Sequence, residues 1–307
     1  MKRRDIILAF ILVIIWGANF TVIKLGLYGI PSMLLAAMRY IFAAFPAVFF
    51  VKKPSIQWKY IIAYGLTVGV GQFSCLFYAM DIGMPAGISS IVTQSQAFMT
   101  PLFAAMLLKE PIKGSQITGL AVSAIGLCLI GGIIGDRGLS TVPFGAFLVT
   151  LLAAFFWAIS NIVLRYANKE AEAQDKTLDM FGMVVWSSLI PPIPLLGMAL
   201  LLDSPETLIS SLSNISIVSV FSILYLAFCA TLFGYGVWSS LMGKYPAAKV
   251  APLSLLVPIT GLIVSWVVLD ERLTSMQWVG GIVIIIGLLI NNFGFTPIKT
   301  VFKAKEK

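Results

Sequence analysis

The chain has 307 residues, of which 59% are hydrophobic and 11% are charged. Soluble domains are about 45–50% apolar and about 25% charged, so this composition excludes an ordinary soluble domain and predicts a polytopic membrane protein in the lipid bilayer. The formal net charge of +8 comes from basic residues scattered in short loops, without a continuous basic stripe, so no nucleic-acid partner is expected.

Apolar stretches of about 20 residues, taken in chain order, predict ten transmembrane helices and an all-α fold. They cover residues 6–23, 31–51, 58–80, 86–108, 115–135, 143–164, 180–202, 216–242, 250–269 and 275–295. We interpret the first stretch as a helix and not as a signal peptide, because it has no A-x-A-like cleavage site and contains Trp16 and Asn19.

The basic residues test this count. With the N-terminus inside, Lys and Arg fall almost entirely in loops on the N-terminal side of the membrane, and the exceptions are Lys24, Arg39, Arg137 and Arg272. Because cytoplasmic loops carry an excess of Lys and Arg, both termini are predicted to be cytoplasmic.

The two halves of the chain resemble each other. Tyr64 to Ile130 aligns without gaps on Tyr225 to Asn291 at a shift of 161 residues. Matched pairs are Pro85/Pro246, Ala86/Ala247, Glu110/Glu271, Gln116/Gln277, Gly119/Gly280 and Gly126/Gly287. Five helices per half is an odd number, so the copies, residues 1–137 and 138–307, are predicted to be inverted repeats within one transport domain. Inverted repeats are typical of transporters and place a substrate site near the membrane midplane, which predicts a central cavity between the halves.

Several kinds of chemistry find no support in the sequence. His is absent, and Cys75, Cys128 and Cys229 lie in apolar stretches without metal-like spacing. No G-x-x-x-x-G-K-[ST] motif is present, and without His no Ser–His–Asp triad can form. We therefore expect no metal, no cofactor and no enzymatic activity.

Polar residues inside predicted spans are the candidate site, because each is costly in a membrane. Arg39 is either a counter-charge for a substrate carboxylate or a structural tie to a neighbouring helix. Lys24 closes the first span and either assists Arg39 or extends to the membrane interface. No carboxylate lies mid-span: Glu110, Asp270 and Glu271 lie at helix ends, where such residues usually cap or tie the next helix.

Two aromatic–amide pairs also point to a cavity. Trp16 precedes Asn19 by one helical turn, and Trp157 precedes Asn161 in the same way, so each pair shares a helix face. They either line an amphipathic cavity or serve as an interfacial anchor and a helix bridge. Tyr235 is a further candidate for covering the apolar part of a substrate.

The stretch "TQSQ" carries two glutamines in a fourth span that is otherwise apolar. At about 100° per residue, Gln94 and Gln96 point about 200° apart. Gln96 continues a polar stripe with Ser89, Thr93 and Thr100, which we predict to face the cavity. Gln94 is predicted to grip a neighbouring helix or to lie at the edge of the cavity. The matching stripe in the second half, which is much less polar, is Val250, Ser254, Val257 and Gly261.

The motifs "WGANFTVIKLGL", "IGMPAGISSIVTQSQAF", "VWSSLIPPIP", "YGVWSSLMGKY", "VAPLSLLVPITGL" and "LDERLT" resemble the EamA family of the drug/metabolite transporter superfamily. The likeness is greatest to its members that export O-acetylserine and cysteine. It implies ten helices in two inverted repeats, with the fifth and tenth peripheral, and carries a transport role to Trp16, Asn19, Lys24, Arg39, Gln94 and Gln96. One departure is "LKEP" at Leu108, where the family usually has Gly-Glu-Arg.

The resulting hypothesis is a secondary exporter of small amphipathic metabolites of the O-acetylserine and cysteine kind, acting by alternating access across the bacterial inner membrane. Export of other amino acids or of small drugs by the same fold is the first alternative. A membrane scaffold without transport activity is the second. The oligomeric state is not predicted.

Overall fold

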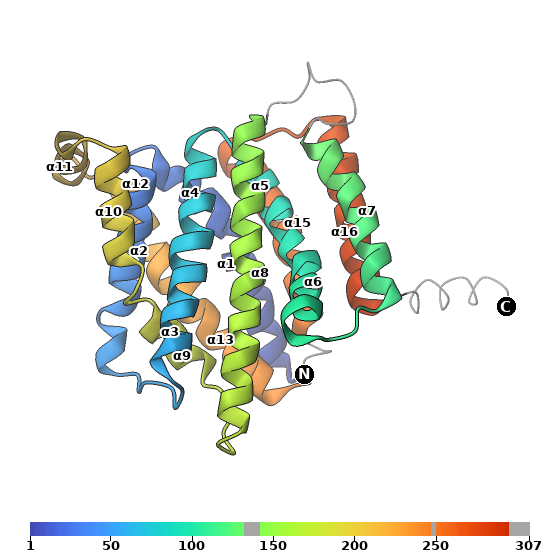
Figure 1. Ribbon diagram of the computed structural model, residues 1–307. Helices are drawn as coiled ribbons and strands as arrows, with labels where there is room; N and C mark the ends of the chain where they lie inside the picture. The colour runs from blue at the N-terminus through green and yellow to red at the C-terminus, as the bar shows by residue number, and fades with distance from the viewer. Residues whose placement is uncertain (132–141, 247–249, 295–307) are drawn as a thin grey trace.

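The computed structural model describes residues 1–131, 142–246 and 250–294 (Figure 1), and within these ranges every regular element is helical. The α-helices are α1 (Arg3–Leu27), α2 (Ser32–Ala44), α3 (Trp58–Tyr64), α4 (Phe73–Asp81), α5 (Ala86–Val92), α6 (Gln96–Leu108), α7 (Gly114–Ile130), α8 (Phe144–Glu172), α9 (Met180–Ser187), α10 (Pro192–Leu202), α11 (Pro205–Ser213), α12 (Ile217–Leu224), α13 (Gly234–Lys244), α15 (Val257–Leu269) and α16 (Ser275–Phe293). Short 3₁₀ segments are η1 (Ala47–Phe49), η3 (Thr93–Ser95) and η6 (Ala251–Leu256), and π-helices are η2 (Gly65–Gln72) and η5 (Tyr225–Phe233). The predicted all-α class is confirmed for this part of the chain.

Several of these helices are long and apolar enough to cross a membrane. By length and composition they number seven, or eight if the bent pair α9 and α10 forms one span. Gly114–Ile130 and Leu253–Leu269 are apolar but shorter. The predicted repeat boundary at residues 137 and 138 lies outside the described residues, as do Arg137, Lys249 and the C-terminal residues 295–307.

Breaks in the helices have identifiable causes or partners. α9 and α10 are bent by 41° where Pro191 and Pro192 follow each other, because proline removes a backbone donor. η2 joins α3 to α4, and η5 joins α12 to α13, so wider turns lie in the middle of two spans. In η5 the Thr231 hydroxyl donates to the Leu226 carbonyl, five residues earlier, at 2.8 Å.

Local features also recur at the offset of 161 residues. Lys109 and Asp270 both adopt left-handed backbone, with φ of 57° and 50°, at the C-terminal ends of α6 and α15. At the start of α7 and α16, the Gln116 and Gln277 side chains accept hydrogen bonds from the backbone N–H groups of Lys113 and Thr274 at 2.8 and 2.9 Å. At α16 the Thr274 hydroxyl also accepts from the Gln277 backbone N–H at 3.3 Å, which completes a capping box.

α7 and α16 lie side by side at one edge of the molecule (Figure 1) and form the most extensive helix pair of the fold. Glycines allow this close approach: a Cβ on Gly119 would lie 2.7 Å from the Gly287 carbonyl oxygen, and one on Gly126 would lie 2.6 Å from that of Gly280. Gly119 meets Gly287, whereas Gly126, later in α7, meets Gly280, earlier in α16. The two helices are therefore antiparallel.

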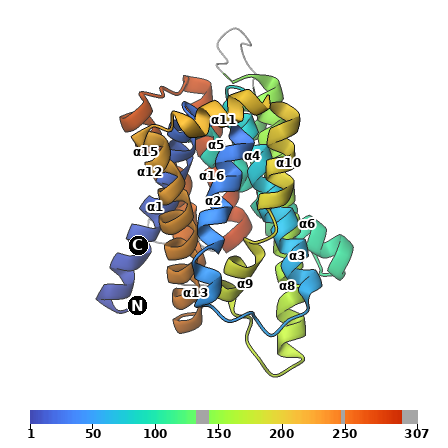
Figure 2. The same cartoon turned by 90° about the vertical axis from the view of Figure 1, so that its left-hand side faces the viewer.

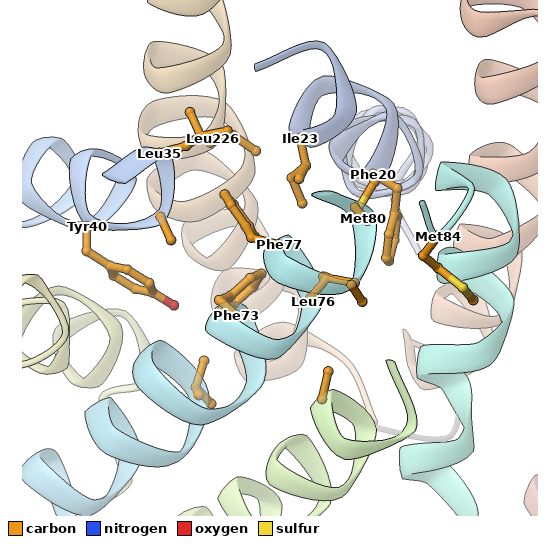
Figure 3. Packing of buried hydrophobic residues seen from close by; sticks show 14 of the residues in the cluster. Phe20, Ile23, Leu35, Tyr40, Phe73, Leu76, Phe77, Met80, Met84 and Leu226 are labelled. Atoms are coloured by element: carbon orange, nitrogen blue, oxygen red, sulfur yellow. The ribbon is translucent and has the colours of Figure 1, made fainter. Parts of the chain in front are cut away.

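The buried apolar core surrounds α4. Figure 3 shows Phe73, Leu76 and Phe77 of α4 among side chains from α1, α2 and η5. Phe73 packs edge-on against Tyr40 of α2 and Phe77, with ring centroids 6.0 and 6.1 Å apart. α2 stands between α12–α13 and α10 (Figure 2), so the inner face of α2 is fully enclosed.

Candidate functional site

A cavity of about 280 Å³ opens among α1, α2, α4, α6, α8 and α13. Protein ligand pockets usually measure about 300–1,000 Å³, so this volume suits a small metabolite. The predicted residues that line the cavity are Trp16, Asn19, Arg39, Thr93, Gln94, Gln96, Trp157, Asn161 and Tyr235. The structure thus brings them together from distant parts of the chain, while their role in binding stays a prediction. Among the described residues, α7 and α16 contribute nothing to the lining.

Arg39 supplies the formal charge of the cavity. Its side chain is 3% exposed, and Nε and Nη2 donate to the Thr231 hydroxyl at 3.2 and 3.1 Å. The Phe73 ring lies 3.9 Å from the guanidinium carbon, which is a cation–π contact. Nη1 is buried without a hydrogen-bond partner in the described part of the chain, and no lining residue described there is acidic. A buried cation without a paired carboxylate is costly, so this arrangement favours an anionic group from outside the protein.

Aromatic side chains also line the cavity. The Trp16 ring lies 5.5 Å from both the Tyr235 and the Trp238 rings, and Trp16 Nε1 donates to the Ala230 carbonyl at 3.0 Å. The polar end of the indole is therefore held, and its apolar face is available to the cavity. Asn19, one turn along α1, has a buried Oδ1 without a partner among the described residues.

Gln94 and Gln96 both line the cavity, and a place at the cavity was one of the two alternatives predicted for Gln94. A 3₁₀ segment, η3, runs from Thr93 to Ser95 between α5 and α6. It turns about 120° per residue, whereas an α-helix turns about 100°, so the angle between the two side chains falls from about 160° to about 120°. Ser89, which the predicted stripe included, is fully buried and donates to the Pro85 carbonyl of its own turn at 2.9 Å.

The less polar stripe of the second half reaches the cavity only in part. Ser254 and Val257 line it. Gly261 instead packs against Ser90, and Val250 is buried in a separate small cluster.

Lys24 is not among the lining residues, which argues against the predicted assistance to Arg39. Its Nζ donates to the Met80 carbonyl at 2.6 Å, near the C-terminal end of α4. Carbonyls at a helix C-terminus attract cations, so the long side chain ties α1 to α4.

Other lining or supporting residues were missed by the sequence analysis. Tyr64, Gln72 and Trp238 line the cavity, and Thr231 holds Arg39. Gln72 carried the same signal as Gln94, an amide inside an apolar span. Thr231 gave no comparable signal, because hydroxyls are common in membrane helices.

The two hairpin carboxylates have different partners. Glu271 accepts hydrogen bonds from the backbone N–H groups of Ala86 and Gly87 at 2.8 and 2.9 Å, which caps α5. Glu110 instead forms an ion pair with Arg165 of α8. Both side chains tie helices, but they tie α5 and α8, and not the next helix in the chain as predicted. In the described residues no group of three or more His, Cys, Asp or Glu side chains could hold a metal ion.

Apolar helices arranged around a cavity with polar walls define a multi-pass membrane protein. A model of the EamA-like transporter family matches residues 3–132 and 144–293. The chain belongs to this family, as predicted.

Its relatives include the "Probable amino-acid metabolite efflux pump" of Escherichia coli, which is 43% identical over 96% of both chains, and that of Salmonella typhimurium, 43% identical over 98% of both. The "Probable terminal-alkyne amino-acid exporter" of Streptantibioticus cattleyicolor is 25% identical over 95% of both chains. One crystal structure matches with a TM-score of 0.61 at 13% identity, covering 95% of this chain and 98% of the other. That likeness supports the fold alone.

Proposed function

We propose that this protein exports small amino-acid metabolites of the O-acetylserine and cysteine kind across the bacterial inner membrane. Two relatives with 43% identity carry the name of an amino-acid metabolite efflux pump, and a third is named an amino-acid exporter. The cavity has a volume and a lining that suit such a cargo.

The proposed architecture has ten spanning helices in two inverted repeats, residues 1–137 and 138–307, within one transport domain. Recurrence of the π-helices, the left-handed residues Lys109 and Asp270, and the glutamine caps of α7 and α16 at one offset supports the duplication. The antiparallel contact between α7 and α16 supports the inversion, because equivalent helices of inverted copies must run in opposite directions.

The observation that carries the proposal is Arg39, a buried cation in the cavity wall with an unpartnered Nη1 and no acidic neighbour among the described lining residues. A substrate carboxylate would supply the missing partner by a charge-assisted hydrogen bond. A cation exporter would instead need a buried acid, because the cargo's charge must be compensated in the membrane interior.

The other lining residues fit an amphipathic amino-acid metabolite. Gln94, Gln96, Asn19 and Asn161 would contact the polar groups, while Trp16, Trp157 and Tyr235 would cover the apolar part. In the proposed cycle, rocking of one repeat against the other opens the cavity to each side in turn, with both termini in the cytoplasm.

Efflux from loaded proteoliposomes tests this function. We expect loaded proteoliposomes to release O-acetylserine faster than loaded liposomes without protein. Arg39→Gln should reduce the efflux rate at least about tenfold, because the loss of a charged hydrogen bond costs about 1.5–3 kcal/mol. Arg272→Gln is the matched control, because Arg272 is exposed and its ion-pair partner among the described residues is the exposed Asp270.

The same assay separates the alternatives. Equal efflux with and without protein for O-acetylserine, cysteine and other amino acids would exclude the proposal. Efflux of other amino acids or small drugs alone would keep the transport mechanism and change the cargo. A scaffold would show no efflux of any of these and no effect of Arg39→Gln.

A further inference from the structure

A second, more polar pocket lies next to the cavity. It has a volume of about 470 Å³ and lies between α6, α7, α8 and α16, close to the Glu110–Arg165 ion pair. We call this pocket the vestibule. Its side chains include Lys113, Arg165 and Asn291. Apart from two residues that it shares with the cavity, the vestibule is separate from the candidate site described above.

Gln96 and Asn161 line both the vestibule and the cavity. Asn161 Nδ2 donates to Gln96 Oε1 at 2.8 Å and to the Thr100 hydroxyl at 3.1 Å. The two amides therefore form a hydrogen-bonded bridge between α8 and α6 at the boundary of the two spaces. A molecule that moves from one space to the other meets this bridge.

The bridge keeps unused hydrogen-bonding capacity. An amide has a donor end and an acceptor end, and Gln96 Nε2 and Asn161 Oδ1 have no partner in the described part of the chain. Both side chains are only partly buried. A solute with an acceptor and a donor of its own can thus bind to the bridge and replace the bond between the amides, since a neutral hydrogen bond adds little net stability.

The charges of the vestibule define the class of solute. Lys113 and Arg165 contribute positive charge, and Arg165 is compensated by Glu110. Asn291 Nδ2 donates to the Ala97 carbonyl at 3.3 Å, whereas Asn291 Oδ1 is buried without a partner among the described residues. Lys113 forms no ion pair within the described residues and attracts a carboxylate, and the unpartnered Asn291 amide oxygen accepts from a donor such as an ammonium group.

We propose that the vestibule is a loading site for small zwitterionic amino acids and that the Gln96–Asn161 bridge is the partition they open to enter the cavity. This inference rests on the proposed export function for the identity of the solute. The partition itself depends only on the geometry of the two pockets.

Thiol labelling tests the partition without any substrate. In a chain with Cys75, Cys128 and Cys229 replaced by Ala, a cysteine at Thr93 reports on the cavity and one at Ser115 reports on the vestibule. We expect Asn161→Ala to raise the rate at which a small, charged thiol reagent applied from the vestibule side labels Thr93→Cys by about tenfold. Labelling of Ser115→Cys should not change.

Equal labelling of Thr93→Cys with and without Asn161→Ala, while Ser115→Cys reacts, would overturn the partition. If Ser115→Cys is itself unreactive from that side, the vestibule is not open to solution and the proposal also fails. Circular dichroism and size-exclusion elution of each variant identify any that is misfolded, and Asn161→Leu then serves as the replacement.

Efflux of O-acetylserine tests the loading site. We expect Lys113→Gln to raise the internal concentration for half-maximal efflux by up to about fivefold with an unchanged maximal rate, as for loss of an exposed charge pair. Lys109→Gln is the matched control, since Lys109 is also exposed, belongs to the same hairpin and does not line the vestibule.

Equal half-maximal concentrations for both lysine variants would overturn the loading site. If no variant and no wild-type protein exports O-acetylserine, the proposed function fails, while the labelling result still decides the partition. The two failures are therefore distinguishable.

Discussion

The hairpin after α6 and the hairpin after α15 have the same local structure and different partners. Each begins with a left-handed residue, Lys109 or Asp270, and each places a glutamate next, Glu110 or Glu271. Glu271 holds the N-terminal end of α5 through two backbone hydrogen bonds. Glu110 instead forms an ion pair whose two side chains are each 42% exposed, beside the vestibule.

The difference indicates which end of the molecule is held together. At the Glu271 end, Lys24 also ties α1 to α4, so four helices are joined there. At the Glu110 end, a solvent-exposed ion pair stabilises little and polar space remains between the helices. Equivalent residues of the two hairpins thus have different roles, since Glu271 joins helices while Glu110 lies beside a polar pocket.

The largest effect is expected from Glu271→Gln. A carboxylate accepts both N–H groups of α5, whereas an amide accepts one and turns its own donor toward the other. We expect a loss of about 1.5–3 kcal/mol in the free energy of unfolding, the range for hydrogen bonds to charged groups. Thermal unfolding of the purified protein in detergent measures it. An unchanged midpoint would show that the cap does not hold this end.

Gly87→Ala tests the contact between α5 and α15 by adding a methyl group to α5. A Cβ at Gly87 would lie 2.4 Å from the Ser265 hydroxyl oxygen and 3.1 Å from Leu262 Cδ2, so these side chains must turn away or α15 must move. Overpacking of this kind costs about 1–3 kcal/mol. Gly114→Ala at the other end is the control, because nothing lies within 4 Å of its Cβ, and a gain of about 0.4–1 kcal/mol is expected. Destabilisation by both substitutions, measured by thermal unfolding, would remove the contrast.

Lys24→Met separates the tie from the substrate site. The substitution keeps the apolar stem and removes the bond to the Met80 carbonyl. We expect a loss of about 1 kcal/mol in stability and no change in the substrate concentration for half-maximal efflux. A large rise in that concentration would show that Lys24 contributes to substrate binding.

Glu110→Gln should have the smallest effect. The substitution breaks an exposed ion pair, which is worth about 0–1 kcal/mol, and this stabilisation should disappear in high salt for the wild-type protein as well. Thermal unfolding at low and high ionic strength checks this. If Glu110→Gln lowered the free energy of unfolding as much as Glu271→Gln does, both ends of the molecule would be held equally.

Much of this fold and site could be predicted from composition and spacing. Apolar length identified the helices, and the cost of burying Arg39 and Gln96 in an apolar span marked them as candidates for what proved to be the cavity wall. The capping box at Thr274 was predictable because its hydrogen bonds join residues three apart. These features depend on short-range chemistry that a sequence displays directly.

The rest depends on tertiary contacts. The sequence left two places open for Gln94, because η3, the 3₁₀ turn that changes its direction, has no signature in "TQSQ". The direction of Lys24 depends on where the Met80 carbonyl lies, which is 56 residues away in the chain. The hydrogen bond between Gln96 and Asn161 joins two residues that are 65 positions apart in the chain and lie on different helices. It therefore could not be predicted from the sequence of either helix alone.

The guanidinium of Arg39 also bears on the electrical work of export. On the proposed function, this charge stays in the cavity wall while the cargo leaves. A unit charge that crosses the membrane gains or loses about 2.3 kcal/mol per 100 mV of membrane potential. A zwitterion carries none, so the membrane potential would do no work on this cargo itself. An amino acid with a second carboxylate would instead be driven outward by an inside-negative voltage.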